Sequence, residues 1–180
     1  MIDAALEIAQ IRHGFVLAER HGIDFTLLKE TERINKRRIE QLMEKVRKSL
    51  WVVKEKKIGV LGLAFKPNTD DIREAPALEM IDALLQRGAK VKCYDPEAMP
   101  NVQRILGDKV VFSEKMYSAL EGADFLVVAT EWPEFRTPDF GKLDSLLSEK
   151  VIFDGRNVFE MDTMRKHGYT YYSIGRKDIK

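Results

Sequence analysis

The chain has 180 residues, and its 30 Lys and Arg against 29 Asp and Glu give a formal net charge of +1. This balance offers no electrostatic reason to expect nucleic acid or an anionic membrane surface as a partner. No apolar stretch approaches the roughly 18 residues of a membrane span, and the single cysteine, Cys93, excludes an internal disulfide and a cysteine-based zinc cluster.

The first part of the chain, residues 1–53, is predicted to be a helical arm. Apolar residues such as Leu28, Leu42 and Val46 fall at helical spacing in its second half. Basic residues alternate there with glutamates, which favours a solvated, salt-bridged face over a nucleic-acid face. Two isolated helices cannot bury their apolar stripes alone, so we expect the arm to pack on the following domain or on a second chain, as in a homodimer.

Short apolar strands alternate with helices in the second predicted domain, residues 54–180. We expect strands at residues 58–63, 90–94, 109–112, 125–129, 151–153 and 170–173, and helices at residues 77–87, 115–121, 141–147 and 161–167. Gly88, Gly122 and Gly168 stand where C-terminal helix caps are expected. Buried strands alternating with helices predict an α/β fold, a Rossmann-like, doubly wound and mainly parallel sheet preceded by the helical arm.

The segment KIGVLGLAFKPNTDDIREAP, residues 57–76, is the most informative stretch of the chain. Its apolar strand runs into a charged loop, and ligands of open α/β sheets bind beyond the carboxyl ends of strands. Lys66 lies beside an aromatic and a proline, where it can meet a phosphate as a point charge, although a solvated loop lysine fits this position equally well. Arg73 can pair with a phosphate or with Asp70 or Asp71, and the local salt bridge is favoured.

A second cation, Arg156, follows another predicted strand in VIFDGRN. Gly155 lets the backbone turn there, and a guanidinium fork can grip a diphosphate or a base edge. Lys66 and Arg156 therefore belong to one rim of the sheet. The segment TEWPEF, residues 130–135, follows a third strand on the same rim, where Trp132 is either a pocket wall or a structural aromatic.

The turn after the first strand lacks the full G-x-G-x-x-G fingerprint of a dinucleotide site. Gly59 and Gly62 are present, but LAFK replaces the tight glycine loop and the helix begins only near Pro76. We therefore do not expect this sheet to bind NAD in the ordinary way. Asp95 occupies the place of a ribose-binding acid, but a turn or cap role in Asp-Pro-Glu is favoured.

Candidates for catalysis and for metal binding are few. Cys93 lies inside the second predicted strand, where a buried small hydrophobe is expected rather than a nucleophile. The three histidines, His13, His21 and His167, show no metal-ligand spacing. We predict no catalytic residue and no metal site.

Five segments occur in a fixed order along the chain: GLAFKPNTDDIREAP, YDPEAM, ATEWPEF, VIFDGRN and YTYYSIGR. Together they resemble the UDP-glucose/GDP-mannose dehydrogenase family, specifically its C-terminal UDP-sugar-binding domain, over about residues 21–176. Members of this family oxidise the C6 hydroxyl of a nucleotide sugar to a carboxylate with two NAD molecules. An N-terminal domain binds NAD, and a central helix mediates dimerisation; residues 1–53 resemble the end of that region.

The resemblance assigns roles to four residues by their position in the matched motifs. It implies that Phe65, Lys66 and Arg156 contact the UDP-sugar, and that Arg73 reaches toward NAD bound on the partner domain. The family's nucleophilic cysteine segment and its N-terminal glycine motif have no counterpart in this sequence, and Cys93 is too far from that motif to replace them.

We therefore expect the substrate-binding part of an NAD-dependent nucleotide-sugar 6-dehydrogenase, inactive by itself. UDP-glucose, oxidised to UDP-glucuronate, is the preferred substrate, with UDP-N-acetylmannosamine and GDP-mannose as alternatives. A non-catalytic nucleotide-sugar-binding or oligomerisation module is the other reading, and an intact NAD-binding domain a weaker third. The mixed, acidic N-terminus does not resemble a secretory signal, so we expect a cytoplasmic protein with neither nucleic acid nor membrane as partner.

Overall fold

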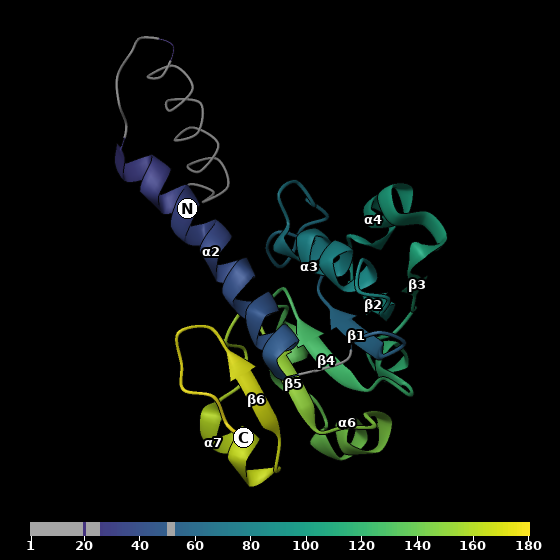
Figure 1. The fold of residues 1–180 in the computed structure, drawn as a ribbon. Helices are drawn as coiled ribbons and strands as arrows, with labels where there is room; N and C mark the ends of the chain where they lie inside the picture. Colours follow the sequence, from purple (N-terminus) through teal and green to yellow (C-terminus); the bar gives the residue numbers. More distant parts are fainter. Residues whose placement is uncertain (1–19, 21–25, 50–52) are drawn as a thin grey trace. The chain divides into compact units, whose positions relative to one another are not determined.

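The computed structural model describes residues 20, 26–49 and 53–180 (Figure 1). The chain divides into two compact units, Met1–Arg38 and Ile39–Lys180. The first helix predicted for the arm, together with His13 and His21, lies outside the described residues. No helix of the described part is long and apolar enough to cross a membrane.

Helix α2 (Thr26–Ser49) carries the predicted salt-bridged face. Arg33 pairs with Glu30 at 2.7 Å and Lys48 with Glu44 at 3.1 Å, at the three- and four-residue spacings that bring side chains together on a helix. In the second unit, Leu42 and Val46 from the last turns of α2 are buried in the core of the sheet domain. The end of α2 therefore buries its apolar face against the sheet domain.

The sheet of the second unit is entirely parallel and has six strands in the order β3-β2-β1-β4-β5-β6. The strands are β1 (Lys57–Leu61), β2 (Lys90–Tyr94), β3 (Val111–Phe112), β4 (Phe125–Val128), β5 (Val151–Asp154) and β6 (Thr170–Ser173). This order confirms the predicted Rossmann-like fold. Since the order reverses between β1 and β4, their carboxyl ends form the switch point where such sheets bind ligands.

The helices of the second unit are α3 (Pro76–Leu85), α4 (Met99–Leu106), α5 (Pro133–Arg136), α6 (Phe140–Leu146) and α7 (Met161–Lys166), with 3₁₀ turns η1 (Gly107–Lys109) and η2 (Tyr117–Leu120). The helix predicted at residues 115–121 is the 3₁₀ turn η2. Helices α4 and α5 were not predicted. Each has proline in its first turn, a position that tolerates proline but is easily read as a break.

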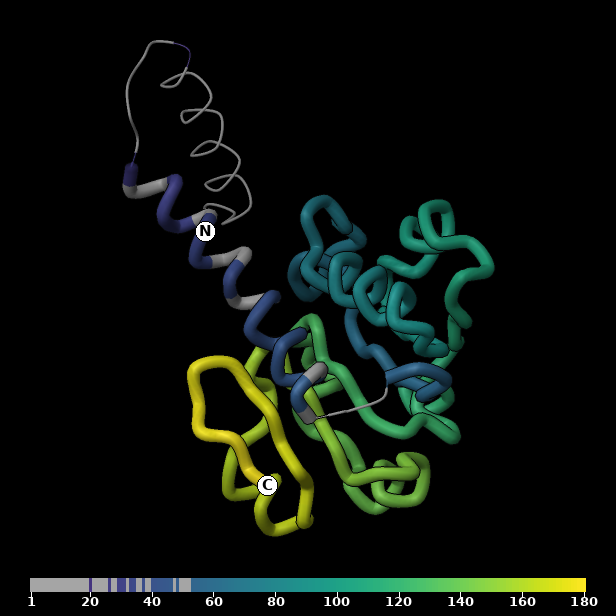
Figure 2. Tube along the Cα trace, in the orientation of Figure 1, coloured from purple at the N-terminus to yellow at the C-terminus, as the bar shows by residue number. Residues whose placement is uncertain are grey.

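Two apolar cores lie on opposite faces of the sheet. Side chains alternate along a strand, so Ile58 and Val60 of β1 enter the core with α3, whereas Leu61 enters the core with α6 and α7. After β6 the chain turns back, and Ile179 pairs antiparallel with Tyr171 (Figure 2). Helices on both faces leave the ends of the strands as the open edges of the domain.

Candidate functional site

The loop after β1, residues 62–75, begins where the chain leaves the sheet. Gly62 has φ +89°, and a Cβ built there would lie 2.5 Å from Thr130 Cβ and 2.6 Å from Thr130 N. A glycine is therefore needed for the close approach of β1 to the chain after β4. Thirteen residues separate Gly62 from α3, so β1 does not run directly into a helix N-terminus as it would in an ordinary dinucleotide site.

Side chains from neighbouring strand ends hold the first residues of this loop. The amides of Leu63 and Ala64 donate to Asp95 Oδ2 at 2.7 and 3.0 Å. Thr130 Oγ1 donates to the Ala64 carbonyl at 2.6 Å. The Phe65 amide donates to the Asp71 carbonyl, and the Phe65 carbonyl accepts from Arg156 Nη2, each at 2.8 Å. The backbone leading to Lys66 is thus fixed by β2, β4 and β5 together.

Asp95, directly after β2, is completely buried. Its Oδ1 accepts from the amides of Glu97 and Ala98, and its Oδ2 accepts from Trp132 Nε1 at 3.0 Å besides the two amides of the loop after β1. The two bonds from Glu97 and Ala98 confirm the predicted turn role, and the five bonds together occupy the acceptors that a ribose would need. The residues present therefore do not fit NAD in the ordinary seat of this sheet.

Trp132 is only 6% exposed, and its indole nitrogen is the side-chain donor to Asp95. A tryptophan held in this way serves as a structural aromatic, the second of the two predicted alternatives. It joins the segment after β4 to the end of β2.

Asp154, the last residue of β5, organises the turn that carries Arg156. It is fully buried and accepts from the amides of Arg156, Val158 and Phe159 and from the Tyr171 hydroxyl. Burial raises the pKa of the Asp154 carboxyl above its ordinary value, against the lowering effect of these hydrogen bonds. The turn is therefore built around an internal acid that a ligand does not reach.

The guanidinium of Arg156 spans two strand ends. Nε donates to the Ala129 carbonyl at 3.0 Å, Nη2 donates to the Phe65 carbonyl, and Nε lies 3.2 Å from Glu131 Oε2. The structure thus brings Arg156 into direct contact with Phe65, the residue before Lys66. Phe65 and Lys66 are both partly exposed at this rim. Side chains of this kind can hold an anion next to an apolar ring surface.

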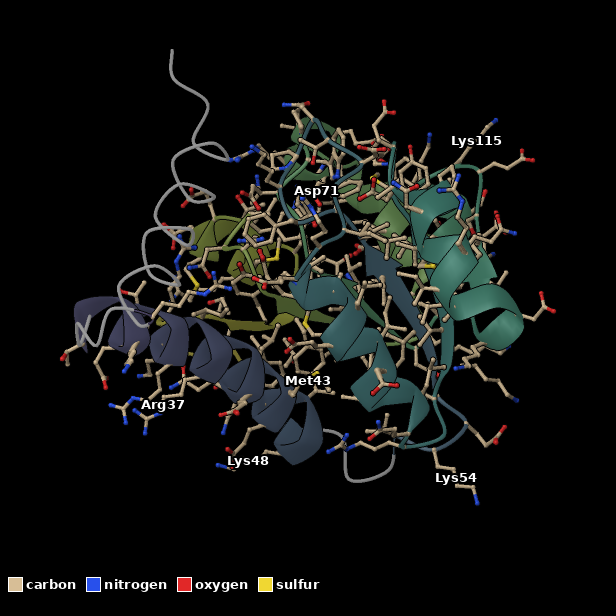
Figure 3. All side chains as sticks on the ribbon, turned by 90° about the horizontal axis from the view of Figure 1, so that it is seen from above. Arg37, Met43, Lys48, Lys54, Asp71 and Lys115 are labelled. Carbon is tan, nitrogen blue, oxygen red and sulfur yellow. The ribbon has the colours of Figure 1, made fainter. Side chains whose placement is uncertain are left out.

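Arg73 lies on the same loop but pairs locally. Its Nε and Nη2 donate to the two carboxylate oxygens of Asp71 at 2.9 and 2.7 Å, which confirms the favoured local salt bridge. The hydrogen bond from Arg73 lowers the pKa of Asp71 to about 2. The Arg73 side chain is 87% exposed, so the pair faces solvent. Asp71 lies far from Lys54, which precedes β1 at the amino ends of the strands (Figure 3).

Cys93 is buried in β2, and burial raises the pKa of its thiol to about 12. The thiolate is the nucleophilic form of cysteine, so this residue is poorly suited to attack a substrate. The prediction of a buried structural cysteine is confirmed.

An open pocket of about 220 Å³ lies elsewhere, between the end of α2 and the end of β6, and none of the predicted site residues lines it. Its lining residues are Gln41, Leu42, Glu44, Lys45, Lys48, Ser173, Ile174 and Gly175. Lys45 is 2.6 Å from Asp178 and 2.7 Å from the Ser173 carbonyl, and Lys48 pairs with Glu44. Both lysines of this pocket are therefore paired with acidic side chains.

Sequence reasoning gave Asp95 a turn role, but it did not identify Asp95, Thr130 and Asp154 as the scaffold of the rim. Asp95 and Asp154 each stand at a strand end, and an acid there is a detectable signal. Some of their donors lie in distant segments, for example 37 positions away for Trp132 on Asp95 and 17 positions away for Tyr171 on Asp154. Spacing along the chain does not reveal such contacts.

Comparisons with known proteins agree with this geometry. The model of the UDP-glucose/GDP-mannose dehydrogenase family, UDP binding domain, matches residues 59–161. UDP-glucose 6-dehydrogenase TuaD of Bacillus subtilis (strain 168) is 41% identical over 164 residues, which are 91% of this chain and 36% of that protein. The chain thus spans about a third of the length of this relative.

Solved structures with the same fold include two nucleotide-sugar dehydrogenases. A UDP-glucose dehydrogenase from the hyperthermophilic archaeon Pyrobaculum islandicum matches with a TM-score of 0.71 and 32% identity, over 88% of this chain and 34% of that one. A UDP-D-ManNAc dehydrogenase from Pyrococcus horikoshii matches with a TM-score of 0.70 and 28% identity, over 90% of this chain and 36% of that one. With the family match extending over more than half of its residues, the chain belongs to the UDP-glucose/GDP-mannose dehydrogenase family and corresponds to its UDP-binding domain.

Proposed function

We propose that this chain is the UDP-sugar-binding part of an NAD-dependent UDP-glucose 6-dehydrogenase, which oxidises UDP-glucose to UDP-glucuronate. The main support for this proposal is the hydrogen bond from Arg156 to the Phe65 carbonyl. This bond fixes the residue before Lys66, so that the cations Lys66 and Arg156 both belong to the strand ends at the switch point of the sheet. A nucleoside diphosphate presents the negative charge that such a rim attracts.

Each residue of the rim has a distinct role in the proposal. Lys66 binds a diphosphate oxygen as a point charge, and Phe65 packs its ring against the nucleotide. Arg156 has five N–H donors, of which the carbonyls of Ala129 and Phe65 take two, and the others remain for a diphosphate or a base edge. These residues bind and orient the substrate, and none of them takes part in the oxidation.

NAD is the proposed cofactor of the whole enzyme, in which it would accept hydride from the sugar C6. Since the ordinary seat in this sheet does not fit NAD, the cofactor would be held mainly by another domain, and Arg73 would reach it after leaving Asp71. On this proposal the chain alone binds UDP-sugar without turning it over. We further propose that the arm predicted at residues 1–53 serves homodimerisation, that residues 54–180 bind the substrate, and that the enzyme is cytoplasmic.

UDP-glucose is the first choice of substrate, supported by what the names of TuaD and the Pyrobaculum structure say of those proteins. The Pyrococcus relative acts on a different UDP-sugar, so UDP-N-acetylmannosamine is the first alternative and GDP-mannose the second.

Calorimetric titration of the chain tests the proposal, with UDP-glucose, GDP-mannose and NAD as separate ligands. We expect UDP-glucose to bind and Lys66→Ala to weaken binding roughly 10- to 100-fold, the value of a hydrogen bond to a charged group. Lys54→Ala, an exposed lysine at the opposite edge of the sheet, is the matched control and should leave the affinity unchanged. Binding of NAD without any binding of UDP-glucose would overturn the proposal, as would equal effects of the two lysine variants.

A further inference from the structure

Asp95 joins three strand ends through one buried carboxylate. It accepts from the loop after β1, from the turn after its own strand β2, and from Trp132 after β4. We propose that Asp95 is a positioning residue of the nucleotide-sugar site, which fixes the backbone that presents Phe65 and Lys66. This inference rests on the proposed function, since it assumes that Lys66 contacts the ligand.

Two successive amides, those of Leu63 and Ala64, converge on Asp95 Oδ2. In an ordinary dinucleotide fold, backbone amides at this place hold the pyrophosphate, and the acid after the second strand holds the ribose. In this structure the acid accepts hydrogen bonds from those amides, so neither group is available to a dinucleotide. A bound anion would therefore contact the side chains of the next two residues, Phe65 and Lys66, instead of the backbone amides.

Asp95 supplies a large share of the restraint on this segment. Five backbone groups between Leu63 and Phe65 have partners: two donate to Asp95, and the others contact Thr130, Asp71 and Arg156. Lys66 is the next residue, so its Cα lies one peptide bond beyond a backbone whose amides and carbonyls are almost all held. Preorganisation of this kind increases affinity because less freedom is lost on binding.

The chemistry of the carboxylate explains why an amide would not replace it. Asp95 faces N–H donors on both oxygens, and an asparagine side chain at this position would turn its own NH₂ group toward two or three of them. Asp95→Asn therefore loosens the loop strongly. Trp132→Phe removes one donor and keeps the carboxylate, so it is the milder variant.

A double-mutant cycle with Lys66 separates positioning from general stability. The affinity of the full chain for UDP is measured by calorimetry and its unfolding by urea, for Asp95→Asn, Trp132→Phe, Lys66→Ala and the two doubles. We expect Asp95→Asn to weaken UDP binding about tenfold when Lys66 is present and less than about threefold in Lys66→Ala. The loss of stability should be the same in both backgrounds. Trp132→Phe should show the same pattern with smaller changes, and it carries the test if Asp95→Asn does not fold.

Asp124→Asn is the matched control, because Asp124 also accepts a backbone amide, that of Lys57, at the amino end of β1. It should lower stability and leave UDP affinity unchanged. Equal losses of UDP affinity with and without Lys66 would overturn the positioning role and leave the proposed function intact. A Lys66→Ala chain that binds UDP like the wild type would instead overturn the proposed function of the rim. Faster solvent exchange of the Leu63 and Ala64 amides in Asp95→Asn would support the inference directly.

Discussion

Arg156 Nη2 donates a hydrogen bond of 2.8 Å to the carbonyl oxygen of Phe65, a residue 91 positions earlier in the chain. The same guanidinium donates from Nε to the Ala129 carbonyl. Arg156 thereby ties the ends of β1, β4 and β5 at the switch point of the sheet. Arg156, which is expected to bind an anion, therefore also stabilises the loops that form the rim.

Arg156→Lys keeps the charge but cannot reproduce the fork that meets two carbonyls. With one or both bonds lost in a partly buried setting, we expect a loss of about 1–3 kcal/mol in the free energy of unfolding. Urea denaturation measures this loss. Arg165→Lys, in which an exposed arginine pairs with Asp162, is the matched control and should change stability by less than about 0.5 kcal/mol. Similar costs for both variants would contradict the bridging role.

Gly62→Ala should be far more destabilising than Gly168→Ala. Both glycines have positive φ, but a Cβ at position 62 meets the backbone of Thr130, whereas one at position 168 meets nothing within 4 Å. We expect about 1 kcal/mol for Gly168→Ala from backbone strain, and about 3 kcal/mol or more for Gly62→Ala, where overpacking adds to strain. Denaturant unfolding of the two variants side by side decides the matter, and equal costs would be inconsistent with close packing of β1 against Thr130.

The Asp71 carboxyl should titrate with a pKa of about 2, because Arg73 donates to both of its oxygens. The unfolded value is about 3.9, so the unfolded chain binds more protons between these two values. The pair therefore stabilises the fold above about pH 4 and loses its effect as pH falls through the folded pKa. Since Arg73 is exposed, solvent screening should keep this contribution to stability small.

Carboxyl NMR titration checks this prediction, with Arg73→Ala as the comparison. In that variant the Asp71 pKa should return close to its ordinary value. An unchanged low pKa in Arg73→Ala would show that groups other than the guanidinium, such as the backbone amide of residue 73 or Lys66, cause the shift.

Cys93 should resist alkylation in the folded chain. It is fully buried, and at pH 8 a thiol with a pKa of about 12 is almost wholly protonated. We expect labelling by iodoacetamide at least about 100-fold slower in buffer than in urea. Rapid labelling of the folded protein would contradict both the burial and the raised pKa.

The sheet was largely predictable from sequence because buried parallel strands are short apolar runs between turn residues. The main errors have local causes. The first predicted strand ran to residue 63, but positive φ at Gly62 ends the ladder with Leu61. Helices α4 and α5 were not predicted; both are short, with eight and four residues, and each has proline in its first turn.

The positions of site residues were predictable only where the sheet topology or a short spacing along the chain determines them. Lys66 and Arg156 could be placed on one rim because parallel strands put their carboxyl ends together. The pairing of Arg73 with Asp71 was predictable because the two residues are only two positions apart in the chain. The hydrogen bonds of Asp95 to residues 31 to 37 positions away depend on strand order and register, which the spacing of residues does not give.

Amide chemical shifts recorded during a titration with UDP test the central claim most directly. If the rim binds the nucleotide, the amides of Phe65, Lys66 and Arg156 should shift in a saturable manner, while that of Lys54 at the opposite edge stays in place. Shifts that gather instead around Lys48 and Gly175, or no shifts at high UDP concentration, would contradict a UDP site at the carboxyl ends of β1, β4 and β5.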